Sequence, residues 1–114
     1  MIIADRTLLF SSSELQSKIE VRVLVYQPML SKEVDGFFEC SIDFTGPISR
    51  SEQVYGLDTF QALSLALFAV TNYLRTLESK GSLFLENGED YSTKDDLGFI
   101  RDVSDMSDDL LNDQ

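Results

Sequence analysis

The side chains in this chain that could carry out chemistry are almost all carboxylates. The 114 residues include 20 acidic and nine basic ones, a single cysteine and no histidine. Without histidine the chain lacks the commonest general base near neutral pH and the commonest transition-metal ligand. What remains is acid–base chemistry by paired carboxylates, or the binding of Mg²⁺ or Ca²⁺ by their oxygens.

The spacing of these carboxylates does not match a metal site. In the acidic stretch 86–96, Gly88 comes too early for a calcium-binding loop, and Lys94 falls where a ligand oxygen is required. The adjacent acidic pairs at 95–96 and 108–109 place their side chains in diverging directions in regular structure. We therefore expect no catalytic residues, no metal and no cofactor. The alternative is a carboxylate-dependent metal hydrolase, which the finding of a bound Mg²⁺, Mn²⁺ or Ca²⁺ ion would favour.

Cys40 has the surroundings of a structural thiol. It alternates with Phe38, Ile42 and Phe44 in a segment that predicts a strand, which places it among apolar side chains. A buried thiol without a basic neighbour is unreactive. One cysteine also excludes an internal disulfide and fits a reducing compartment, so we expect a cytoplasmic protein.

The net charge of −11 is concentrated near the C-terminal end. Residues 86–114 hold ten acidic and two basic residues, whereas residues 1–85 hold ten and seven. A negative surface is repelled by phosphate backbones, so direct binding to nucleic acid is disfavoured. No apolar run approaches the roughly 20 residues of a membrane span, and residues 1–10 lack the pattern of a signal peptide. We expect neither nucleic acid nor membrane as a partner.

Strands are predicted for the first half of the chain. Residues 18–26 and 36–45 alternate apolar and polar side chains, and residues 2–10 are rich in branched apolar ones. Residues 50–56 form a weaker fourth strand, and residues 83–86 a short fifth. The short polar links between them favour an antiparallel arrangement.

One long helix is predicted over residues 58–79. Asp58 and Gln61 have the spacing of a capping box at its start. Six large apolar residues follow at intervals of three and four, which predicts an apolar stripe facing the strands. They are Phe60, Leu63, Leu67, Val70, Leu74 and Leu77. The expected fold class is α+β, with a four- to five-stranded, mostly antiparallel sheet and one long helix packed on one face.

The C-terminal quarter has two interpretations. We divide the chain into a single α+β domain over residues 1–100 and an acidic tail or short amphipathic helix over residues 101–114; residues 90–96 are expected to form a solvated loop. The end of the chain either solubilises the domain or recognises a basic protein, with carboxylates steering the encounter and apolar side chains anchoring it. The predicted partner-binding residues are Asp95, Asp96, Asp102, Asp105, Met106, Asp108, Asp109 and Leu110.

Several segments resemble a bacterial family of short proteins of uncharacterised function. They are IIADRTL at 2–8, FECSI at 38–42, GLD at 56–58 followed by QALSLAL at 61–67, and LGF at 97–99. Ile100 stands where the family usually has proline, and the acidic end lies beyond the pattern. The resemblance implies an α+β domain and transfers no site, because these motifs are fold determinants.

The overall profile also resembles that of bacterial immunity proteins, which are short, cytoplasmic, acidic and poor in catalytic residues. Such proteins neutralise toxins, often basic nucleases, by binding them. The sequence therefore predicts a non-enzymatic immunity protein that binds a basic bacterial toxin domain of the nuclease type. The alternative is a self-associating or regulatory protein-binding module, such as a homodimer, with Phe37 and Tyr55 as outward-facing interface anchors.

Overall fold

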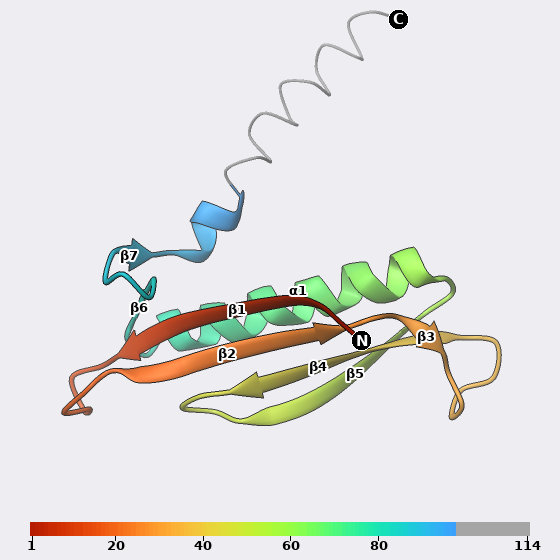
Figure 1. Cartoon of the computed structure of the whole chain (residues 1–114), viewed down its shortest axis with the longest axis horizontal. Helices are drawn as coiled ribbons and strands as arrows, with labels where there is room; N and C mark the ends of the chain where they lie inside the picture. Colours follow the sequence, from red (N-terminus) through yellow and green to blue (C-terminus); the bar gives the residue numbers. More distant parts are fainter. Residues whose placement is uncertain (98–114) are drawn as a thin grey trace, which may run out of the picture.

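The alternating segments near the N-terminus form the central hairpin of an antiparallel sheet in the computed structural model, which describes residues 1–97 (Figure 1). β1 (Ile2–Ser11) pairs with β2 (Ile19–Tyr26) along nearly its whole length. β2 also pairs with β4 (Phe38–Thr45), and β4 pairs with β5 (Arg50–Gly56). These four long strands match the predicted segments to within two residues at each end.

Three short strands extend the sheet within the described residues. β3 (Met29–Leu30) pairs with the start of β4, β6 (Ser82–Phe84) pairs with the end of β1, and β7 (Asp90–Tyr91) pairs with β6. The sheet has seven strands, all antiparallel to their neighbours, where four or five were predicted. The predicted α+β fold, a mostly antiparallel sheet with one helix against it, is confirmed.

The helix α1 (Thr59–Glu78) begins and ends where the sequence predicts. The Asp58 carboxylate accepts a hydrogen bond from the Gln61 backbone N–H at 2.7 Å, and the Gln61 side chain accepts one from the Leu57 N–H at 2.7 Å. The two side chains therefore satisfy backbone donors at the helix start reciprocally. Ser79 caps the other end, and its N–H donates to the Arg75 carbonyl.

The face that α1 turns to the sheet matches the predicted stripe only in part. Leu74 and Leu77 are buried as expected, but Phe60 is 80% exposed and Leu67 is 48% exposed. The helix instead faces the sheet with small residues over its first half, and Ala62 is completely buried. The reason is close approach: a Cβ atom at Gly56 would come 2.9 Å from the Cα of Ala62. The periodicity of large side chains predicted the helix and most of its inner stripe correctly, since Leu63 and Val70 also pack against the core.

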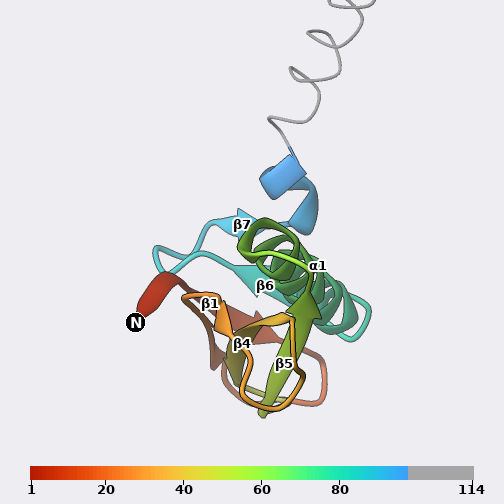
Figure 2. The same cartoon turned by 90° about the vertical axis from the view of Figure 1, so that its right-hand side faces the viewer.

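The hydrophobic core lies between α1 and the inner face of the sheet. α1 runs along β4 and β5, whereas its contacts with β1 and β2 are sparse; Figure 2 shows it lying over β5, with β1 off to the side. Tyr73 stacks on Phe44 with ring centroids 4.1 Å apart, and its hydroxyl donates to the Ile48 carbonyl at 2.6 Å. The inner positions predicted for β2 and β4, including Val21, Val23, Val25, Cys40 and Ile42, are buried.

Residues 90–96 do not form the solvated loop that their charge suggested. They contain β7 and the start of the 3-10 helix η1 (Thr93–Leu97), and both Tyr91 and Thr93 are buried. Thr93 donates from its backbone N–H and its hydroxyl to the Glu78 carboxylate at the end of α1. The charged residues of this segment thus flank Tyr91 and Thr93, whose buried side chains attach the segment to the domain.

Candidate functional site

The one cysteine is positioned as a structural residue. Cys40 is fully buried on β4, and its Sγ lies 3.2 Å from the Tyr26 carbonyl oxygen, to which the thiol donates. Burial raises the pKa of the Cys40 thiol above its usual value. A thiol that is buried and protonated at neutral pH is a poor nucleophile.

The carboxylates of residues 1–97 do not converge on a metal-binding geometry. Within this range no group of three or more aspartate, glutamate or cysteine side chains is arranged to hold an ion. The same residues contain no helix that combines the length and the apolar character needed to cross a membrane.

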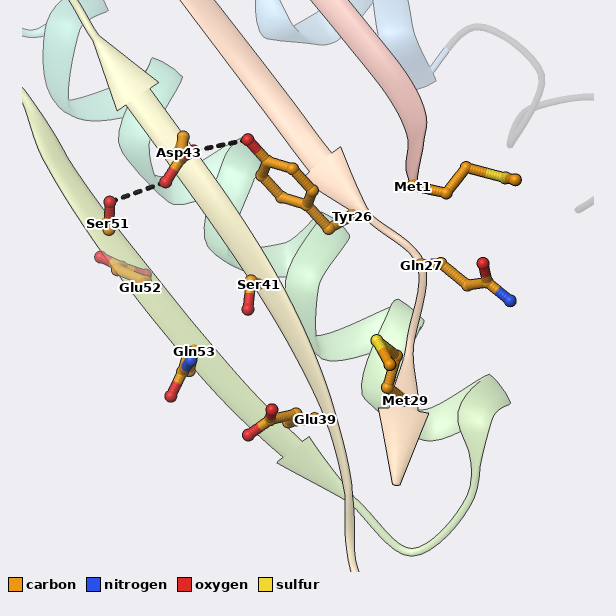
Figure 3. Close-up of a pocket in the computed structure, with 10 residues that line it drawn as sticks. All are labelled: Met1, Tyr26, Gln27, Met29, Glu39, Ser41, Asp43, Ser51, Glu52 and Gln53. Atoms are coloured by element: carbon orange, nitrogen blue, oxygen red, sulfur yellow. Dashed lines mark hydrogen bonds between the residues drawn. The ribbon is translucent and has the colours of Figure 1, made fainter. Parts of the chain in front are cut away.

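The outer face of the sheet carries a groove, which we call the outer groove (Figure 3). Its volume is about 370 Å³, and it lies across β2, β4 and β5. Because side chains alternate along a strand, the residues between the buried positions of β4 point to this face. The lining residues are Met1, Tyr26, Gln27, Met29, Glu39, Ser41, Asp43, Ser51, Glu52 and Gln53.

Asp43 is the most strongly organised residue of the outer groove. Its carboxylate accepts a hydrogen bond from Ser51 Oγ on β5 and another from the Tyr26 hydroxyl on β2, both at 2.7 Å. The hydrogen bond from Ser51, and next that from Tyr26, lower the pKa of Asp43 below its usual value. The hydrogen bond to Asp43 is also the main cause that raises the pKa of Tyr26. The groove therefore holds a fixed negative charge beside a tyrosine ring, and Glu39 adds a second carboxylate.

A second cluster joins the C-terminal part of the described chain to β1. Arg6 donates to Asp96 at 2.6 Å and to the Tyr91 hydroxyl at 2.8 Å, and Tyr91 also donates to Asp96. Burial opposes ionisation of Asp96, but the hydrogen bonds from Arg6 and Tyr91 outweigh it and lower the pKa of Asp96. The pKa of Tyr91 is raised, first by burial and then by its bond to Asp96.

Only two of the predicted partner-binding residues fall within the described residues. Asp95 accepts a hydrogen bond from the backbone N–H of Ser92, the residue just before η1, and Asp96 belongs to the cluster with Arg6 and Tyr91. Both carboxylates thus have partners within the domain. The other six lie outside the described residues: Asp102, Asp105, Met106, Asp108, Asp109 and Leu110.

The aromatic residues proposed as interface anchors are less exposed than predicted. Phe37 and Tyr55 are both half-buried, and the Tyr55 hydroxyl lies 3.2 Å from both Glu33 and Gln53. The most exposed aromatic rings are instead on α1, where Phe60 and Phe68 are 80% and 64% exposed. Sequence reasoning missed this surface because it assigned Phe60 to the inner stripe of the helix and gave Phe68 no role.

A family model described as "Domain of unknown function (DUF6968)" matches residues 4–95. The chain belongs to this family. The uncharacterised family expected from the sequence motifs is thereby confirmed, and the DUF6968 match covers α1 and the long strands except for the first two residues of β1. The acidic C-terminal end lies outside the matched residues. No curated protein and no solved structure is similar to the chain at a significant level.

Proposed function

We propose that this DUF6968 protein is a non-enzymatic, cytoplasmic immunity protein that binds and neutralises a basic bacterial toxin domain of the nuclease type. The observation that carries the proposal is the outer groove, which combines fixed negative charge with side chains suited to an interface. Its lining residues include Asp43 and Glu39 but no lysine or arginine, and only the third carboxylate, Glu52, has a basic partner, Arg50. The net charge of −11 gives the whole molecule the same sign.

The outer groove supports binding by charge complementarity. Asp43 needs no reorganisation to meet an arginine or lysine of a partner, because two hydroxyl groups already hold its carboxylate in place. Tyr26 and the exposed Met29 offer an aromatic ring and a flexible thioether, side-chain types that are enriched at protein interfaces. The carboxylates would occupy the positions that nucleic-acid phosphates take in the cleft of a nuclease.

The acidic residues near the C-terminus contribute to the same proposal at longer range. Asp102, Asp105, Asp108 and Asp109 lie in the part of the chain with the densest negative charge. Charges of this kind raise the association rate of a basic partner more than they slow its dissociation. Asp96 is a poor choice for neutralisation in a test, because it also holds η1 against Arg6.

The test is binding kinetics with the toxin-like protein encoded in the neighbouring reading frame. The outer-groove variant Glu39→Gln with Asp43→Asn is compared with a control that removes the same charge from the β6–β7 turn, Glu86→Gln with Glu89→Gln. We expect the groove variant to lower the association rate at low salt by about threefold to tenfold and to flatten its salt dependence. We expect a smaller effect from the control.

Two outcomes contradict the proposal. Equal rates for the groove variant and the control would remove the outer groove as the binding surface. Absence of binding to the neighbouring protein at any salt concentration would remove the immunity function itself.

Self-association is a second candidate function, favoured by the exposed apolar side chains of α1. Phe60, Leu65 and Phe68 are 80%, 41% and 64% exposed on the described helix. Exposed apolar patches of this kind commonly mark interaction sites. If a second copy covers them, sedimentation analysis detects a dimer that Phe68→Ser dissociates; a monomer at all concentrations excludes this function.

A further inference from the structure

A second groove lies along one backbone edge of β5, and we call it the edge groove. Within residues 1–97, β5 pairs only with β4, so its other edge has no neighbouring strand there. The edge groove has a volume of about 450 Å³ and separates this edge from one flank of α1. Its lining residues are Arg50, Glu52, Val54, Tyr55, Leu65, Phe68, Ala69 and Asn72.

The flank of α1 beside the edge groove carries exposed apolar side chains. α1 packs on β4 and β5, at one side of the sheet (Figure 2). A helix is about 10 Å wide and strands lie about 4.8 Å apart, so α1 reaches beyond β5 to where a further strand would lie. Leu65 and Phe68 stand on this flank, and they are 41% and 64% exposed. A strand added to β5 would cover both side chains.

The two faces of β5 differ in their surroundings. Glu52 and Val54 pair with buried residues of β4 and therefore share the inner face of the sheet with α1. Ser51 belongs to the outer face, where it lines the outer groove and pairs with Asp43. Because Ser51 is short, a long basic side chain on an adjacent strand can pass over it to the Asp43 carboxylate. An added strand would thus meet an apolar helix flank on one face and negative charge on the other.

We propose that the edge groove binds an extended segment of the basic partner, which pairs with β5 as an additional strand. Its apolar side chains lie against Leu65 and Phe68, and the basic side chains that alternate with them extend over Ser51 toward Asp43. In this mode main-chain hydrogen bonds supply affinity, and the alternate side chains supply specificity. The inference rests on the proposed toxin binding, to which it adds the conformation and the side-chain pattern of the bound segment.

The ion pair between Arg50 and Glu52 restricts which strands can bind. The two side chains are 48% and 31% exposed at the start of β5. A uniformly apolar strand would remove water from both ions without replacing its hydrogen bonds, which opposes binding. The edge therefore fits a segment that is apolar opposite Val54 and polar opposite the ion pair.

A partner of opposite charge fits this edge better than a second copy of the chain. The outer row of a second β5 would present Ser51, Gln53 and Tyr55, none of which offers a positive charge to Asp43. Two copies with a net charge of −11 each also repel one another. Charge complementarity thus favours the basic partner as the occupant of the edge groove.

The first test measures the binding of a synthetic peptide to the full-length protein by fluorescence anisotropy. The probe is a short labelled peptide in which valine and arginine alternate, and the control peptide has the same residues with its arginines grouped at one end. The two peptides have equal charge, so long-range attraction to the acidic protein acts equally on both. We expect the alternating peptide to bind about tenfold more tightly. Equal affinities would overturn the proposal.

Serine variants test the flank of α1. Leu65→Ser with Phe68→Ser removes the apolar wall of the edge groove and should weaken binding of the alternating peptide about tenfold. The control, Leu57→Ser with Phe60→Ser, removes the same side-chain types from exposed positions that do not line the groove, and should leave the affinity unchanged. Equal losses in the two variants, or no loss in either, would contradict the assignment.

Methylation of the peptide's backbone nitrogens separates strand addition from other modes of binding. The amides of alternate residues in a strand point to opposite edges, so only one set of the probe's amides can donate to β5. We expect methylation of one set, either all the valines or all the arginines, to abolish binding, and methylation of the other set to preserve it. Loss with both sets, or with neither, would exclude pairing with β5.

Binding of the neighbouring toxin-like protein distinguishes failure of this inference from failure of the proposed function. If the peptide binds as expected but the neighbouring protein does not bind, the immunity function fails and the edge groove is supported. If the neighbouring protein binds and Leu65→Ser with Phe68→Ser leaves its affinity unchanged, the edge groove is excluded while the immunity function stands. A dimer of the chain that the same variant dissociates would assign the groove to a second copy and overturn the proposal.

Discussion

The two long hairpins of this sheet, β1–β2 and β4–β5, have their apolar faces covered in different ways. The hairpin β4–β5 lies under α1, which approaches so closely that Gly56 and Ala62 leave no room for a larger side chain. The hairpin β1–β2 is joined to η1 by the ion pair of Arg6 with Asp96, and a cavity of about 510 Å³ remains between this hairpin and α1. Close packing on one side therefore leaves large side chains of α1 uncovered on the other.

Among the variants that test this contrast, a change at Ala66 is expected to lower the free energy of unfolding most. It is fully buried on the face of α1 that contacts the sheet, so Ala66→Asp places an unpaired charge in the core and should cost several kcal/mol. Ser64→Asp introduces the same charge at an exposed position of α1 and should change stability by less than about 0.5 kcal/mol. Chemical denaturation of both variants measures the difference. Similar midpoints would mean that the helix presents another face to the sheet.

The close approach of α1 to β5 is tested at Gly56. Gly56→Ala forces a Cβ against the backbone of Ala62, which cannot move without displacing the helix, so we expect a loss of about 2–3 kcal/mol. Gly36→Ala is the control: open space surrounds it, and only its φ of +79° opposes a side chain, at about 1 kcal/mol. Thermal unfolding of the two variants should rank them in this order. The reverse order would refute the tight contact.

The start of α1 contributes a smaller, local effect. Asp58→Ala removes the acceptor for the Gln61 backbone N–H and should destabilise the protein by about 1 kcal/mol. Asp58→Asn keeps an acceptor at the same position and should recover most of the loss. Urea midpoints measure both changes. If the alanine variant and the parent share one midpoint, the cap does not stabilise the fold.

On the β1–β2 side, the stability contributed by the ion pair between Arg6 and Asp96 depends on pH. Because the pKa of Asp96 is lowered by folding, its carboxylate stabilises the protein above its unfolded pKa, and this contribution is lost as pH falls through the folded pKa. Asp96→Asn should therefore cost up to about 1 kcal/mol at neutral pH. The two proteins should converge only once the pH has fallen below the lowered, folded-state pKa of Asp96, where both side chains are uncharged. A difference that is independent of pH would show that the ion pair with Arg6 contributes nothing.

The strands, the helix and its cap could be predicted because each depends on local pattern. Alternation in residues 18–26 and 36–45 gave both the strands and their buried faces, and the capping spacing gave the first residue of α1. The orientation of α1 could not be predicted in the same way. The exposure of Phe60 and Leu67 follows from the contact between Gly56 of β5 and Ala62, which brings the small residues of α1 nearest to the sheet and which the local sequence does not show.

The candidate site was harder to predict because it joins residues from separate strands. Nothing in the local sequence relates Tyr26 to Asp43 or Ser51, and only the register of β2, β4 and β5 brings them together. Asp95 and Asp96 were singled out for their charge, but the structure gives both of them partners inside the domain. Tyr91 was the one indication in this segment that Asp96 has a partner inside the domain. If a tyrosine is buried, as Tyr91 is, its hydroxyl needs a hydrogen-bond partner.

The position of β5 at the end of the sheet also bears on solubility. Within the described residues β5 pairs on one side only, with β4, so its other backbone edge could template the addition of further strands. Arg50 and Glu52 stand on this strand and form an ion pair at 2.8 Å. Charged side chains along an unpaired edge discourage intermolecular sheet growth, because joining two such edges would strip both ions of water. Arg50 and Glu52 thus act as gatekeepers against aggregation.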